Sequence, residues 1–158
     1  MTRYLGSYLN DHLAGATGAI ELTRRAARQY EGSELGALFS RIGTEIQEDR
    51  ATLEAIMART GIGHQRHKHA ATWVLEKLGR LKFNGALLRR SPLTPFVELE
   101  TLAIGINGKL LLWRALQAAP PDPETAAQVD YLIERAEQQL ADVEQCRIET
   151  GRRALKGR

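Results

Sequence analysis

The chain has one cysteine, Cys146, among its 158 residues. It therefore forms no intrachain disulfide, and we interpret Cys146 as a packing residue. No apolar run approaches the roughly 20 residues that a membrane-spanning helix needs, and no charged-then-apolar leader opens the sequence. These absences predict a cytoplasmic protein in reducing surroundings, with no membrane partner.

The sequence also has little that is typical of strands or of common active sites. Alternating runs of β-branched residues are missing, and alanine, leucine, glutamate, arginine and glutamine dominate. There is no Gly-x-Ser-x-Gly motif and no glycine-rich phosphate loop after a strand. The chain is therefore predicted to be all-α, and a non-enzymatic role is favoured over an enzymatic one.

The excess of positive charge is small, because 22 Lys and Arg residues face 19 Asp and Glu residues for a formal net charge of +3. Much of the excess lies in two segments. One is the predicted loop with Arg66 and Lys68, and the other is the C-terminal segment with Arg152, Arg153, Lys156 and Arg158. A nucleic-acid surface usually carries a dense basic stripe, so we do not expect nucleic-acid binding. The loop with Arg66 and Lys68 also contains three histidines, His64, His67 and His69. We expect them to be solvated; the alternatives are adventitious zinc or nickel binding and contact with an acidic partner.

Apolar residues recur at three- and four-residue steps in four long segments, which predicts a single domain, 1–158, built from four long helices. Start and stop signals place the predicted helices at 3–31, 34–60, 95–119 and 124–154, with a short amphipathic helix at 70–82. Among these signals are the caps Ser33, Thr94 and Asp122 and the terminating glycines Gly32 and Gly61.

The connection 61–92 decides the topology. Helices of about 27 residues are roughly 40 Å long, and this connection is long enough to run that distance. If it does, the helices before and after it point the same way. Otherwise the chain is an up-down-up-down bundle with a helical insert. We favour the crossover.

Two helical hairpins joined by one long crossover, which carries a short extra helix, resemble the ferritin-like superfamily of four-helix bundles. That resemblance implies a di-iron site with a carboxylate from each of two helices and Glu-x-x-His from each of the others. No Glu-x-x-His occurs here: Glu45 is followed three residues later by Glu48, and Glu134 by Glu137. The resemblance is therefore to a divergent member, and no catalytic residues are carried over.

Several polar residues fall on or beside the predicted inward faces, namely His12, Glu45, Asp49, Glu100 and Lys109. Burying a charge is costly unless it is paired. We therefore predict that His12 pairs with Asp49 or Glu45, and Lys109 with a carboxylate. Three interpretations stay open: a structural polar network, boundary residues that reach solvent, and a functional cluster for metal or acid–base chemistry. The metal version uses His12, Glu45, Glu48 and Asp49 to hold iron or another divalent cation; otherwise no cofactor is expected.

Two glycine pairs, Gly15-x-x-Gly18 and Gly105-x-x-Gly108, stand near the middle of the first and third long helices. Each glycine costs about 1 kcal/mol of helix stability relative to alanine. We predict a close crossing of the two backbones there. A kink, or space for a bulky neighbour such as Trp113 or Phe39, is the alternative.

The sequence thus predicts a non-catalytic bundle that acts in interaction or assembly, through self-association or a protein partner. The short helix with Trp73 would cover its own core or dock onto a second copy. The alternative is a divergent metal-dependent oxidase or metal-storage protein. It requires carboxylates from at least three helices to converge in the core.

Overall fold

The computed structural model describes residues 3–63, 91 and 93–156. It contains four helices: α1 (Arg3–Gln29), α2 (Glu34–Arg59), α5 (Leu93–Ala118) and α6 (Pro123–Leu155). The described part has no strand, so the all-α prediction is confirmed. None of the helices in that part is long and apolar enough to cross a membrane. The predicted helix at 70–82, with Trp73, and the stretch His64–His69 lie outside the described residues.

The helix ends follow the local chemistry of the sequence. The hydroxyl of Ser33 accepts a hydrogen bond from the Gly36 amide at 3.1 Å and so caps α2. Asp122 caps α6 in the same way, accepting from the Thr125 amide at 2.8 Å. One start differs from the prediction: α5 begins at Leu93, whose amide donates to the Ser91 hydroxyl at 3.2 Å. Thr94 is therefore inside the first turn of α5 and is not its cap.

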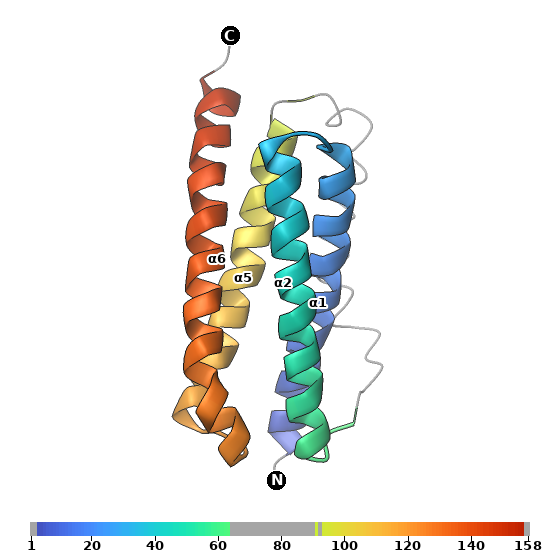
Figure 1. Ribbon diagram of the computed structural model, residues 1–158, viewed down its shortest axis with the longest axis vertical. Coiled ribbons are helices and arrows are strands. Elements are labelled where there is room, and N and C mark those ends of the chain that lie inside the picture. Colours follow the sequence, from blue (N-terminus) through green and yellow to red (C-terminus); the bar gives the residue numbers. More distant parts are fainter. Residues whose placement is uncertain (1–2, 64–90, 92, 157–158) are drawn as a thin grey trace.

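The four helices form one elongated bundle in which α2 and α5 run in the same direction, opposite to α1 and α6 (Figure 1). Around the bundle, α1 packs against α2 and α5, while α6 packs against α5 and α2. The described chain leaves the bundle at the end of α2 and resumes at the start of α5, at the other end (Figure 1). These directions exclude the up-down-up-down alternative.

The apolar core is divided into two clusters along the bundle. One cluster holds Leu53 of α2, Leu110 of α5 and Ala136 of α6, together with Leu9, Leu13, Ile56, Met57, Leu112, Trp113, Leu116, Val129 and Leu132. The other lies toward the opposite end and consists of Leu22, Ala26, Phe39, Ile42, Ile46, Leu99, Leu102, Ile106 and Val143. Between the two clusters, three of the four helices place a polar side chain.

Candidate functional site

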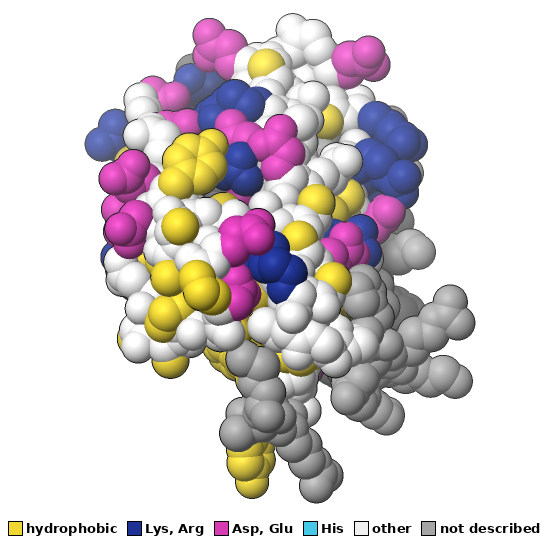
Figure 2. Space-filling view, turned by 60° about the horizontal axis from the view of Figure 1, so that its bottom comes forward, with side chains coloured by type: hydrophobic (Ala, Val, Ile, Leu, Met, Phe, Trp, Pro, Cys, Tyr) yellow, Lys and Arg dark blue, Asp and Glu magenta, His cyan; other side chains and the backbone are white. Residues whose placement is uncertain are grey.

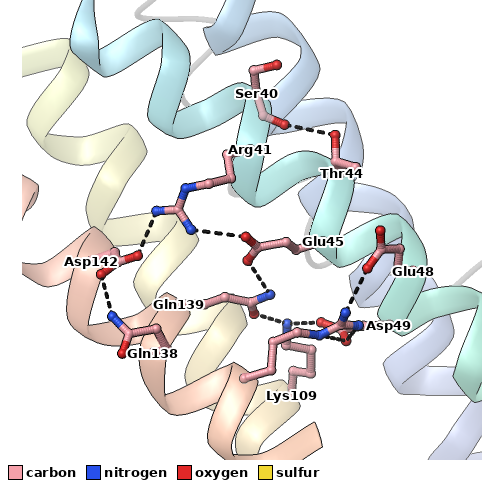
Figure 3. A network of polar contacts seen from close by, with 11 residues as sticks. Ser40, Arg41, Thr44, Glu45, Glu48, Asp49, Lys109, Gln138, Gln139 and Asp142 are labelled. Atoms are coloured by element: carbon pink, nitrogen blue, oxygen red, sulfur yellow. Dashed lines mark hydrogen bonds and ion pairs between the residues drawn. The ribbon is translucent and has the colours of Figure 1, made fainter.

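A buried polar layer separates the two apolar clusters and consists of Asp49, Lys109, Arg135 and Gln139. Asp49 lies between Ile46 and Leu53 on α2, and Gln139 lies between Ala136 and Val143 on α6. The side chains of Asp49, Lys109 and Arg135 are 4%, 13% and 16% exposed. Three helices therefore direct polar groups to one level of the core (Figure 3).

Asp49 is the centre of this layer. One carboxylate oxygen accepts from the Lys109 ammonium, and the other accepts from the Arg135 guanidinium, whose Nε lies 3.0 Å away. Lys109 also donates to the side-chain oxygen of Gln139. Each buried charge in the layer thus has an opposite charge in contact, which offsets part of the cost of removing it from water.

The layer affects the acidity of its two cations in opposite ways. Burial lowers the pKa of Lys109, and the nearby Asp49 carboxylate counteracts part of that change. Burial also lowers the pKa of Arg135, but its hydrogen bonds and attraction to Asp49 outweigh burial and leave the pKa raised. Arg135 therefore stays charged, and Asp49 faces a permanent cation.

The layer continues to the surface through paired side chains between α2 and α6 (Figure 3). Gln139 donates to Glu45 at 2.9 Å, and Glu45 accepts in turn from Arg41 at 3.0 Å. Arg41 also reaches Asp142 of α6 at 2.6 Å. On the other side, Arg135 bonds Glu48 at 2.7 Å. The network therefore links α2 to α6, which pack against each other less extensively than α1 does against α2 or α5 against α6.

Of the residues predicted to form the polar network, Glu45, Asp49 and Lys109 are brought together. His12 is not: no hydrogen bond or ion pair between described residues joins it to Asp49 or Glu45. Instead its ring packs edge-on against Tyr8, with centroids 4.7 Å apart. Burial lowers the pKa of His12, and Asp11 partly counteracts this. His12 is thus a half-buried side chain of α1 that packs locally.

Glu100 also lies apart from the layer, although it was predicted to belong to it. Its side chain is 49% exposed, and it forms an ion pair with Arg147 of α6, at 3.4 Å. The reason is rotational: Glu100 is nine residues before Lys109, which places the two on different sides of α5. Lys109 is instead paired with Asp49 of α2.

The predicted metal ligands do not converge within the described residues. No group of three His, Cys, Asp or Glu side chains there is placed to hold a metal ion. Glu45, Glu48 and Asp49 all lie on α2, and arginine, lysine or glutamine side chains contact their oxygens. The geometry is therefore that of a closed network of ion pairs.

The predicted close crossing at the glycine pairs is wrong. A Cβ atom built on Gly15, Gly105 or Gly108 meets no atom within 4 Å, so no other backbone approaches them in the described part of the chain. The close approach occurs elsewhere: a Cβ on Gly43 of α2 lies 2.7 Å from the Thr23 hydroxyl of α1. A Cβ on Gly151 of α6 likewise lies 2.7 Å from the Phe96 ring of α5, so tight packing against glycine occurs within the α1–α2 and α5–α6 pairs.

Sequence reasoning missed the α6 half of the layer, Arg135 and Gln139. Gln139 had a detectable signal, since it falls three residues after Ala136 and four before Val143 on the inward stripe. The sequence-based prediction also missed Glu98 of α5. This side chain is buried and contacts Arg25 at 3.2 Å and the Tyr30 hydroxyl at 2.7 Å. Burial and this carboxylate raise the pKa of Tyr30.

A second feature is on the outside of the bundle, along the side of α5 that points away from the core. We call this stripe the outer face of α5; it consists of Val97, Thr101, Ile104, Gly108, Leu111 and Ala115. Ile104 and Leu111 are 50% and 54% exposed. The stripe carries no charge, whereas cations and anions are interspersed on the face in Figure 2. The Thr101 hydroxyl donates to the Val97 carbonyl at 2.8 Å, so the only polar side chain of the stripe is satisfied by its own helix.

Comparison of the chain with protein-family models, with curated proteins and with solved structures finds no match.

Proposed function

We propose that this chain is a non-catalytic helical bundle that acts in interaction or assembly and docks a protein on the outer face of α5. The observation that carries the proposal is that α5 is apolar on two opposite sides. Its inner side packs Leu99, Leu102 and Ile106 in the core, while its outer side exposes Ile104 and Leu111. An apolar stripe that stays this exposed is typical of a surface that binds another protein.

The buried polar layer supports a structural role for the interior. Asp49 is engaged by Lys109 and Arg135, and the adjoining Glu45 by Arg41, so a substrate or metal would have to displace those cations. Breaking a buried ion pair costs about 3–5 kcal/mol, which a ligand would have to offset. We therefore assign the layer to fixing the register of α2, α5 and α6.

The same proposal includes two broader expectations. The helix directions and the long connection support a divergent ferritin-like bundle, in which the di-metal site has given way to the ion-paired layer. The single cysteine, Cys146, supports a cytoplasmic location.

Site-specific photo-crosslinking in cells of the source organism tests the docking. A photoreactive amino acid at Leu111 is expected to form a protein adduct in high yield. The matched control carries it at Gln47, an exposed position of α2 away from this face. Equal yields at the two positions would overturn the proposal, because the outer face would then be no more occupied than ordinary surface.

A further inference from the structure

The outer face of α5 has a regular alternation of large and small side chains. Its six residues are spaced four, three, four, three and four apart, which is the heptad spacing of a helix that packs against another helix. One set, seven residues apart, is large: Val97, Ile104 and Leu111. The other set is small: Thr101, Gly108 and Ala115.

This alternation complements itself when two copies of α5 lie antiparallel. In that arrangement each layer joins a residue of one set to a residue of the other. Ile104 would pack over Gly108 of a second copy, Leu111 over Thr101, and Val97 over Ala115. Gly108 has open space in front of it, with no atom within 4 Å of a built Cβ, so it offers room for the isoleucine.

The charges beside the stripe complement each other in the same register. Glu100, Asn107 and Arg114 stand seven residues apart along the side of α5 nearest α6. Side chains at this heptad position face one another in antiparallel pairs, so Glu100 would meet Arg114 of the second copy, and Asn107 would meet itself at the two-fold axis. The side chains of Glu100 and Arg114 are 49% and 51% exposed, and their intrachain partners, Arg147 and Glu137, lie at the surface of α6.

A parallel pairing of the same faces lacks both features. Gly108 would stand opposite Gly108 and leave a gap, while the large residues would meet in their own layers. Glu100 and Arg114 are 14 residues apart, roughly 21 Å along the helix, and would not meet. The sequence of the face therefore selects the antiparallel arrangement.

We infer that the protein docked on the outer face of α5 is a second copy of this chain, with the two α5 helices antiparallel about a two-fold axis at Asn107. The inference rests on the proposed function and specifies its partner. Because the contact is isologous, each residue is used twice, once from each copy.

Sedimentation equilibrium of the purified chain over a concentration series tests this inference. The expected result is a monomer–dimer equilibrium. Leu111→Glu places a charge in an apolar layer twice per dimer and is expected to weaken association by about tenfold or more. The matched control, Ile148→Glu, replaces an apolar residue of α6 that is 42% exposed and should leave the dissociation constant unchanged. Circular dichroism verifies that both variants fold.

A charge exchange tests the orientation. Glu100→Arg and Arg114→Glu each place like charges together and should weaken the dimer by about two- to tenfold. The double variant Glu100→Arg/Arg114→Glu restores opposite charges and should restore association.

Three results would overturn the inference. They are a chain that stays monomeric throughout, a dimer insensitive to Leu111→Glu, and a double variant as weak as the single variants. The first, combined with an adduct to a different protein at Leu111, would leave the proposed function standing and remove only self-association.

Discussion

The inner and outer sides of α5 each carry residues that are unusual for that side of a surface helix. On the inner side, Lys109 is placed in the core between two apolar clusters. On the outer side, Ile104 and Leu111 face solvent. Lys109 is tolerated inside because Asp49 and Gln139 contact it. The comparison teaches that the charged residue of the inner side is matched by polar partners within the chain, whereas Ile104 and Leu111 of the outer side stay about half exposed in the part of the chain that the structure describes.

The largest expected effect comes from removing the charge of Asp49, the α2 residue that pairs with Lys109 on the inner side of α5. Asp49→Asn keeps the shape of the side chain but leaves Lys109 without the carboxylate that contacts it and Arg135 with only the exposed Glu48. We expect a loss of about 3–5 kcal/mol in the free energy of unfolding, measured by urea denaturation. The control, Glu48→Gln, removes a 59% exposed partner of Arg135 and should cost no more than about 1 kcal/mol. Equal losses would mean that the buried layer has no special role.

Glycine substitutions sharpen the comparison with an intermediate effect. Gly43→Ala, on the inner side of α2, would place a methyl group 2.7 Å from the Thr23 hydroxyl, which also bonds the Ala19 carbonyl. Overpacking costs about 1–3 kcal/mol, and the gain in helix propensity offsets only part of it. Gly105→Ala, where the space is open, should raise the unfolding free energy by about 0.5–1 kcal/mol. Thermal melts of both variants should therefore shift in opposite directions; shifts in the same direction would contradict the packing described.

The smallest expected effect concerns His12, which is half-buried and contributes to neither side of α5. Its folded-state pKa lies below the ordinary value of 6.5, so at pH values between the two the unfolded chain binds more protons. The His12 contribution to stability is therefore complete above pH 6.5 and is lost as the pH falls toward the folded-state pKa. Urea denaturation from pH 5 to 8 should show a shallower acid loss for His12→Gln than for the unchanged chain. Parallel curves would mean that burial does not perturb His12.

The local elements were predictable because their signals are local. Apolar periodicity placed the four long helices, and Ser33, Asp122, Gly32 and Gly61 placed ends close to those observed. Asp49 and Lys109 were recognisable as costly inward charges from their positions between apolar neighbours.

The pairings between helices were not predictable in the same way. His12 and Glu100 are titratable residues near apolar stripes, as Asp49 and Lys109 are. The rotation of α1 and α5 about their axes nevertheless directs His12 and Glu100 away from Asp49. Arg135 was missed because a long, flexible side chain at the edge of an apolar stripe can reach inward from a boundary position.

By itself, the sequence determined that this protein is helical, where its helices begin and end, and that charges would have to be neutralised inside it. Only the tertiary structure decided that α2 and α5 run in the same direction, that Asp49 pairs with Lys109 and Arg135, and that the glycines of α1 and α5 do not meet. The physical reason is that helix formation depends on neighbours within four residues. Ion pairing and close packing depend instead on the rotation and register of helices that are distant in the chain.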